Sequence, residues 1–170
     1  IKISTAKGVV NAPFEVFEPQ QRLGNYQGFL PDDVIYFLMP DRFADGDVSN
    51  NKDVDRKNSR AWHGGDFKGI QQKIPYLKEL GITAIWLTPW YDNPDEANNC
   101  DKPWCPMASY HGYGAIDYYG VENHFGNLND LKELVEKAHA KGIKVIQDQV
   151  ANHVGFRHPW MKNPPLENWF

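Results

Sequence analysis

Three short apolar runs stand out between residues 34 and 146 of the chain. Each has the length of a β-strand and is apolar at nearly every position, and they cover 34–39, 82–87 and 143–146. Runs that are apolar on both faces are typical of fully buried parallel strands. Pro40 ends the first run, and Thr88-Pro89 closes the second.

Two segments of helical periodicity separate these runs. Apolar residues recur at three- and four-residue spacing over about 70–80 and 128–138, which predicts amphipathic helices. Gly81 and Gly142 follow as C-terminal stop signals. For the second helix, Asn127 and Asn129 are the alternative N-caps.

The resulting order, strand-helix-strand-helix-strand, predicts right-handed βαβ units in a parallel sheet. The segments that follow the strands are long and polar, whereas the helix-to-strand connections are little more than one glycine. That asymmetry is typical of a (β/α)8 TIM barrel, whose site is built at the carboxyl ends of its strands. A nucleotide-binding α/β fold is disfavoured, because neither G-x-G-x-x-G nor a P-loop follows the first strand.

The length limits how much of such a barrel is present. A whole barrel takes about 250 residues, so 170 residues hold about its first three βα units. We therefore expect a lead-in or linker over 1–30, the first part of the barrel over 31–154, and the start of a long loop (domain B) over 155–170. The remainder of the barrel would come from the same chain or from a partner chain.

The composition argues against two classes of binding partner, nucleic acids and membranes. The net charge is −4 without a basic stripe, which argues against nucleic acid, and the sequence has no apolar run of about 20 residues that would suit a membrane span. Cys100 and Cys105 lack nearby partners for a zinc site. A local disulfide, which would indicate an oxidising compartment, and two free thiols are equally open readings.

Three loops carry candidate chemistry, one after each strand. The first holds Asp45, Asp47, Asn50 and Asn51 within seven residues, and oxygen donors of this kind suit calcium. Asp66 and the carbonyl of Gly64 would complete the shell. The competing interpretation is an Asx-rich surface turn without a metal.

The second loop contains Tyr110-His111-Gly112-Tyr113, which offers an imidazole and a stacking ring to one cleft, or else aromatic packing under a long loop. The third contains Asp148 to His153, where polar side chains would line the mouth of a barrel. There, Asp148 could equally cap local backbone. Because all three follow strands, they would converge on one face of a barrel.

With these motifs in their order, the sequence resembles the alpha-amylase family of glycoside hydrolases (family 13), especially its cyclodextrin glucanotransferase, cyclomaltodextrinase and neopullulanase branches. The likeness covers about 33–154. It is carried by Asp148-x-Val150-x-Asn152-His153, which matches the family's first signature motif, by Tyr110-His111-Gly112-Tyr113, and by the loop from Asp41 to Ile70.

The resemblance implies roles. His111 and His153 would hydrogen-bond the glucose ring at the cleavage site, Tyr113 would stack on it, and Asp148 would orient neighbouring loop residues. A structural calcium would be held by the six ligands named for the first loop. Asn152 is a calcium ligand in many family members, though not in all branches.

The resemblance also implies an alpha-glucan hydrolase or transglycosidase of the retaining kind, which needs two carboxyl groups. In the family these follow strands four and five, and a third Asp follows strand seven. We therefore assign no catalytic residue within the 170 residues and expect them to be inactive alone. The alternative is a non-catalytic carbohydrate- or calcium-binding protein on a degenerate barrel. The polymeric substrate and the disulfide reading favour an extracytoplasmic location over a cytoplasmic one.

Overall fold

The computed structural model describes residues 2–5, 8–11, 28–103 and 105–169. The chain forms two compact units, Ile1–Pro31 and Asp32–Phe170, and each is considered by itself.

The first unit contains two short antiparallel strands, β1 (Lys2–Thr5) and β2 (Gly8–Asn11). The sequence predicted only an irregular lead-in over 1–30, so these strands correct that prediction within the described residues. Four residues are too few to show a convincing alternation, and such a pair is held by backbone hydrogen bonds that any sequence can make. Residues 12–27 lie outside the described part.

The second unit is built on a three-stranded parallel sheet with the order β3-β4-β5. The strands are β3 (Ile35–Leu38), β4 (Ala84–Leu87) and β5 (Lys144–Gln147). In the register, Phe37 lies beside Trp86, and Trp86 beside Ile146. All three predicted strands are confirmed, each one or two residues shorter or shifted relative to the apolar run.

Two helices connect the strands, α2 (Phe67–Glu79) and α3 (Leu128–Ala140). The Asp66 side chain caps α2 by accepting a hydrogen bond from the Gly69 N–H at 2.6 Å. Asn127 caps α3 in a capping box with Asp130, which settles the choice between the two candidate caps. Gly81 has φ +85°, the left-handed conformation that ends a helix and favours glycine.

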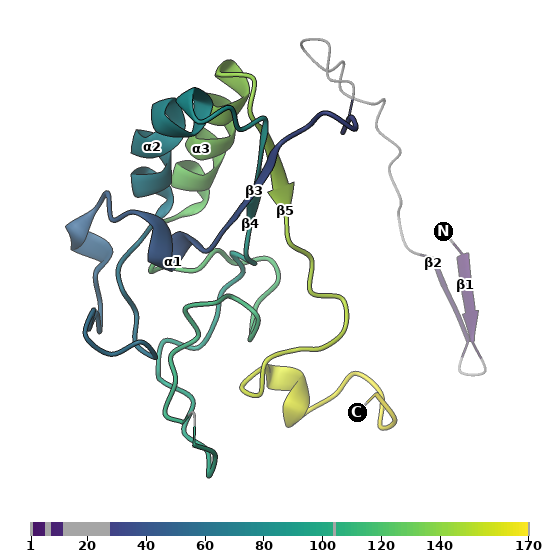
Figure 1. Ribbon diagram of the computed structural model, residues 1–170. Coiled ribbons are helices and arrows are strands. Elements are labelled where there is room, and N and C mark those ends of the chain that lie inside the picture. Colours follow the sequence, from purple (N-terminus) through teal and green to yellow (C-terminus); the bar gives the residue numbers. More distant parts are fainter. Residues whose placement is uncertain (1, 6–7, 12–27, 104, 170) are drawn as a thin grey trace. The chain divides into compact units, whose positions relative to one another are not determined.

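The core lies between one face of the sheet and the two helices, which pack side by side over it (Figure 1). Apolar residues at helical spacing on α2 and α3 meet alternate strand residues there. The buried set includes Leu38, Ile85, Leu87, Ile70, Ile74, Leu77, Leu131, Leu134 and Ala138. Burial of this apolar surface is the main term that stabilises the unit.

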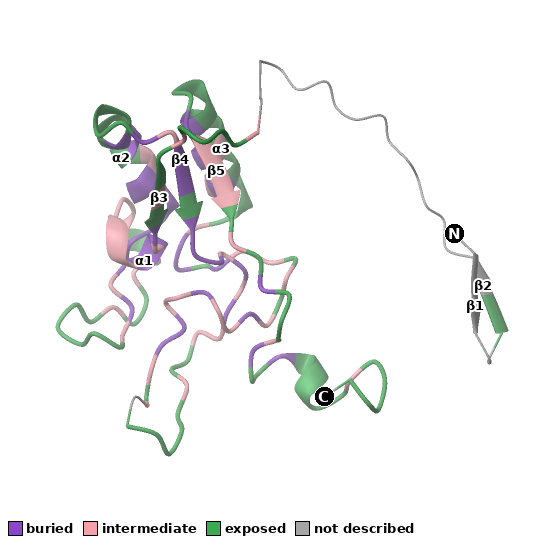
Figure 2. Ribbon diagram, turned by 45° about the vertical axis from the view of Figure 1, so that its right-hand side comes forward, coloured by how far each residue is buried: buried purple, intermediate pink, exposed green. Residues whose placement is uncertain are grey.

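The opposite face of the sheet is open. Ile35 is 49% exposed and Phe37 is 53% exposed, and much of β3 carries the exposed colour in Figure 2. The expectation of strands buried on both faces is therefore wrong for β3. The inner face of a closed barrel is covered by the strands opposite, and the three strands of this unit leave theirs uncovered.

Long loops leave the carboxyl ends of all three strands. The first contains α1 (Pro40–Phe43) and the 3-10 turn η1 (Val48–Asn50), both absent from the sequence prediction. The second runs over about 90–127 with isolated bridges only, and the third carries η2 (Pro159–Met161). Within the described residues, every helix is too short or too polar to cross a membrane.

Candidate functional site

The loop after β3 folds around the carboxylate of Asp66. Its Oδ1 accepts hydrogen bonds from the backbone N–H groups of Gly46 (3.1 Å) and Gly69, and its Oδ2 accepts one from Asp47 at 2.8 Å. One buried side chain therefore both starts α2 and draws the 45–51 segment against it. This is why the acidic residues, far apart in the sequence, lie together.

Three oxygens in this loop are buried without any hydrogen-bond donor: Asp45 Oδ1, Asn50 Oδ1 and Asn51 Oδ1. An unpaired buried acceptor costs about 1–3 kcal/mol, so three in one loop indicate that something positive completes the set. Oxygen ligands of this kind are those that calcium prefers. Of the residues predicted from the sequence, these three thus offer oxygens that fit a calcium ion, whereas both carboxylate oxygens of Asp47 and of Asp66 also have protein donors.

Gly64 approaches the same group. Its φ of +86° is left-handed, and a Cβ there would lie 2.3 Å from Asn51 Oδ1. Asp41, which the sequence prediction did not single out, holds this glycine in place by accepting hydrogen bonds from the N–H groups of Gly64 (3.1 Å) and His63 (2.8 Å). Burial raises the pKa of the Asp41 carboxyl, against the lowering effect of these bonds.

Two basic side chains form ion pairs with carboxylate oxygens of this loop. Arg56 pairs with Asp45 Oδ2, and Lys68 pairs with Asp47 Oδ2, each at 2.5 Å. The hydrogen bond from Lys68, followed by those from Ser49, holds the pKa of Asp47 well below its usual range. Since Arg56 contacts Oδ2 of Asp45, Oδ1 of the same carboxylate keeps no donor.

The second and third loops meet at Asp148, directly after β5. Its Oδ2 accepts hydrogen bonds from the Tyr113 hydroxyl at 2.8 Å and from Trp86 Nε1 at 3.2 Å. Burial, and next the hydrogen bond to Asp148, raise the pKa of Tyr113 to about 12, so the phenol keeps its proton and remains the donor. The sequence prediction counted Trp86 only as a strand residue, because a single indole in an apolar run gives no sign of a polar partner.

His111 lies beside Tyr113, with ring centroids 5.9 Å apart and planes 24° apart. Its Nδ1 accepts the Tyr113 backbone N–H at 3.0 Å, which requires an unprotonated Nδ1. Burial lowers the pKa of the imidazole. The neutral ring therefore carries its proton on Nε2, as a hydrogen-bond donor.

His153 joins the group through Tyr113. Its Nε2 lies 2.9 Å from the Tyr113 carbonyl oxygen, which can only accept, so Nε2 is the donor. Its Nδ1 contacts the side-chain amide of Asn152 at 3.1 Å. Both ring nitrogens are thus engaged within the protein, and a hydroxyl ligand would have to replace one of these partners.

A cavity of about 400 Å³ opens where these residues meet. His111, Tyr113 and His153 form one side of it, so the structure brings three of the four predicted substrate residues to one concave surface, with Asp148 behind Tyr113. Met107 and Cys105 line the same cavity. They lie on a disulfide finger (98–107) closed by the Cys100–Cys105 bond and an antiparallel bridge between Asn98 and Met107, so the two cysteines are paired.

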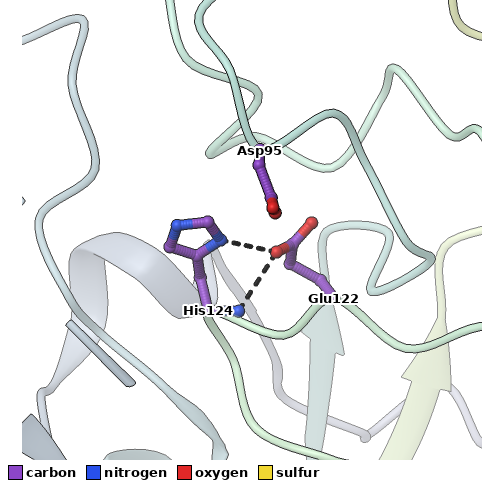
Figure 3. Close-up of side chains that lie close together, drawn as sticks. All are labelled: Asp95, Glu122 and His124. Carbon is purple, nitrogen blue, oxygen red and sulfur yellow. Dashed lines mark hydrogen bonds and ion pairs between the residues drawn. The ribbon is translucent and has the colours of Figure 1, made fainter. Parts of the chain in front are cut away.

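A second acidic group, missed by the sequence prediction, lies deeper in the loop after β4 (Figure 3). Ligand atoms of Asp95, Glu122 and His124 fall within 4.8 Å of one another. However, Glu122 Oε1 lies 2.7 Å from His124 Nδ1, and Glu122 Oε2 accepts the N–H of Asn93 at 3.0 Å. Two ligands of one tetrahedral metal stand about 3.3 Å apart, so this is a hydrogen-bonded pair rather than a metal centre.

The Asp95 carboxylate also has donors, whereas His124 Nε2 is buried without a hydrogen-bond partner. Asp95 accepts from Lys52 at 2.9 Å and from the Asn123 amide at 3.0 Å, and the His124 ring stacks on Trp62 with centroids 3.9 Å apart. In the sequence, the only sign of this group is that Glu122 and His124 are two positions apart. The hydrogen bond that Glu122 accepts from Asn93, in a distant part of the loop, could not be predicted from that spacing.

Known proteins share this sequence and fold. The family model of the alpha-amylase catalytic domain matches residues 37–166. A cyclomaltodextrin glucanotransferase of Klebsiella oxytoca is 44% identical over 128 residues, 71% of this chain and 19% of that protein. Neopullulanase 2 of Thermoactinomyces vulgaris is 39% identical over 130 residues, 72% of this chain and 20% of that protein.

A solved structure of an Anoxybacillus alpha-amylase has a TM-score of 0.72 and 46% identity, covering 82% of this chain and 28% of that one. The chain spans between 10% and 20% of the length of five curated relatives that it matches. The parallel sheet is therefore part of a (β/α)8 barrel, and both the family and the predicted branches are confirmed. The chain belongs to the alpha-amylase family of glycoside hydrolases and carries part of its catalytic domain.

Proposed function

We propose that this chain forms the first part of the barrel of a retaining enzyme that hydrolyses or transfers the alpha-1,4-glucosidic bonds of starch, maltooligosaccharides or cyclodextrins. The observation that carries the proposal is the cavity shared by His111, Tyr113 and His153 at the carboxyl ends of β4 and β5. Sites of barrel enzymes lie at this end.

In this proposal the residues of the cavity bind and orient one glucosyl unit. The Tyr113 ring, fixed through its hydroxyl by Asp148, stacks on the apolar face of the sugar. His111 donates from Nε2 to a sugar hydroxyl, since its Nδ1 already accepts from backbone. His153 exchanges its bond to the Tyr113 carbonyl for one to the sugar.

The 170 residues alone supply binding and not bond cleavage. Retaining glycosidases need a nucleophilic carboxylate and a second carboxyl that acts as acid and then base, and the family places these after strands four and five. We assign neither role to Asp148, because its Oδ2 is occupied by Tyr113 and Trp86. The barrel is completed by further sequence, from the same chain or from a partner.

The test compares the natural protein that contains this sequence with the purified 170-residue chain, both incubated with maltooligosaccharides. We expect cleavage by the former, none by the latter, and a loss of about 100-fold or more in kcat/KM for Tyr113→Ala in the natural protein. Cleavage by the 170 residues would overturn the proposed division. Sugar binding without cleavage by the natural protein would favour the alternative, a non-catalytic carbohydrate-binding protein.

We also propose that the loop after β3 binds a structural calcium through Asp45, Asp47, Asn50, Asn51, Asp66 and the carbonyl of Gly64. The three buried oxygens without donors support this site. Asn152 is left out of this ligand set, because it lies after β5 and its amide contacts His153. When bound, the ion would supply the positive charge that those oxygens lack.

Isothermal titration with calcium tests the site. We expect one ion per chain, and a loss of at least about tenfold in affinity for Asp45→Ala, because a charged ligand is removed. Asp55→Ala is the matched control, since Asp55 is an exposed acid of the same loop whose side chain accepts a hydrogen bond from the nearby N–H of Lys57. Equal affinities for the two variants would contradict the site.

The proposed domain division keeps a lead-in over 1–30, barrel over 31–154 and the start of domain B over 155–170.

We place the protein in an oxidising, extracytoplasmic compartment, because the Cys100–Cys105 bond is of a kind that persists there. Free-thiol labelling of the protein as isolated from its source under denaturing conditions tests this, and two reactive thiols would contradict it.

A further inference from the structure

Phe156 presents an aromatic ring to solvent at the rim of the cavity. The residue is 79% exposed, although it lies only two positions from Val154 and the signature segment that contains His153. It lines the same cavity as His111 and Tyr113. A single exposed aromatic residue is common on protein surfaces. This ring is distinguished by its position at the cavity and by the backbone contacts that hold it there.

The backbone under Phe156 is fixed on both sides. The Gly155 N–H donates to the Ala115 carbonyl at 2.7 Å, and the His158 N–H donates back to the Gly155 carbonyl at 2.9 Å. Gly155 packs so closely on the Tyr113 loop that a Cβ there would lie 2.1 Å from the Gly114 carbonyl oxygen. Gly155 therefore locks the segment to the loop that carries the proposed sugar-stacking residue.

The neighbour on the other side is also tied down. Arg157 forms an ion pair with Glu96, which belongs to the loop after β4, and His158 is buried next to Tyr118. The ring of Phe156 is thus displayed by a segment that is anchored through Gly155, Arg157 and His158. Preorganisation of this kind lowers the entropy that a ligand must offset on binding.

Part of the cavity lining comes from the disulfide finger. Cys105 and Met107 line the cavity together with Phe156, and the Cys100–Cys105 bond limits how far that wall can move. The cavity therefore has the His111–Tyr113 pair, the finger and Phe156 among its walls. A flat ring on one of them is suited to the apolar face of a pyranose, as it is to other flat or weakly polar groups.

We propose that Phe156 is a platform for a second glucosyl unit of an alpha-glucan, next to the unit bound at Tyr113. This inference rests on the proposed function and adds to it a residue that favours longer oligosaccharides over short ones. Phe156 acts in binding only and takes no part in bond cleavage.

Equilibrium binding of maltose, maltotriose and maltohexaose to the natural protein that contains this sequence, measured before turnover, tests the platform. For Phe156→Ala we expect affinity for maltohexaose to fall about three- to tenfold, as for the loss of one aromatic contact, and affinity for maltose to change less than about twofold. Phe156→Leu should lose as much as Phe156→Ala, whereas Phe156→Tyr should retain the wild-type value, because the flat ring rather than apolar volume is required.

Tyr119→Ala is the matched control, because Tyr119 is fully exposed in the loop after β4 and does not line the cavity. An equal loss in Tyr119→Ala and Phe156→Ala would overturn the platform, as would wild-type affinity of Phe156→Ala for maltohexaose. In both results Tyr113→Ala still reports on the proposed sugar site. If the wild-type natural protein binds none of the three sugars, the site at Tyr113 and the platform both fail.

Discussion

The loops after β3 and β4 each bury a group of polar side chains, but the two groups differ in whether their buried oxygens have hydrogen-bond donors. In the loop after β4, the carboxylate of Glu122 has protein donors on both oxygens, from Asn93 and His124. In the loop after β3, Asp45, Asn50 and Asn51 each keep a buried oxygen without a donor. Since buried polar groups are normally paired, the Glu122 carboxylate is satisfied within the polypeptide, whereas the three oxygens of the loop after β3 are the ones for which we propose calcium.

The largest expected effect is the removal of calcium. A ligand present at about 100 times its Kd stabilises the state that binds it by about 2.7 kcal/mol, which corresponds to about 5–10 °C in Tm for a chain of this size. We expect a fall of this order when a chelator replaces saturating calcium in a thermal melt followed by circular dichroism. Magnesium should not restore it, because it demands a more rigid octahedral shell. An unchanged Tm would contradict calcium binding by the loop after β3.

The next effect is that of Glu122→Gln. The substitution replaces one accepting oxygen with an amide nitrogen, which cannot accept. Either the Asn93 N–H or the donor of His124 therefore loses its partner, at a cost of about 2 kcal/mol. Urea unfolding should show the same loss in calcium and in chelator. Glu133→Gln, at an exposed position of α3, should change stability by less than about 0.5 kcal/mol. A loss seen only in calcium would show that the two loops are coupled.

Gly64→Ala separates strain from metal binding. Its left-handed φ costs a non-glycine residue about 1 kcal/mol, and the added Cβ would displace Asn51 Oδ1. We expect about 1 kcal/mol of destabilisation in chelator and no rise in Tm on adding calcium. Gly81→Ala is the control, because Gly81 has φ +85° with open space around its Cα. It should show the strain and keep its calcium response.

The smallest effect concerns the pH dependence of the loop after β4. Burial, and next the charges of Glu122 and Asp95, raise the pKa of Asp92 to about 6. Between about pH 4, the pKa in the unfolded chain, and pH 6, the folded state binds more protons, so this group makes stability fall as pH rises through that window. Asp92→Asn should therefore raise Tm by about 1–2 °C at pH 7.5 and have no effect at pH 4. Equal gains at both pH values would contradict the charge explanation.

The elements of the fold were predictable where local pattern and burial agree. Leu77 and Leu134 recur in register with their neighbours because one helix face meets the sheet, and glycines end both helices. α1 was not predictable, since four residues, Pro40–Phe43, show no period. The exposure of Phe37 was not predictable either, because an apolar run reports what a residue prefers and not whether a partner strand is present.

The candidate site was predictable where its residues are close in sequence. Asp45 to Asn51 and Tyr110 to Tyr113 carry their chemistry in one segment. Asp41 and Trp86 were missed, because their roles depend on partners, Gly64 and Asp148, that only the fold brings near. The pairing of Cys100 with Cys105 remained open for the same reason, since two cysteines five positions apart suit either state.

The disulfide finger has a consequence for the covalent connectivity of the chain. Its tip includes the exposed residues Asp101 to Pro103, which are accessible to proteases. A cut at one peptide bond between Cys100 and Cys105 would leave the two pieces joined through sulfur. The nicked protein would run as one band on a denaturing gel without reductant and as two with it. The wall of the cavity would thus be severed in its backbone while both ends stay tethered.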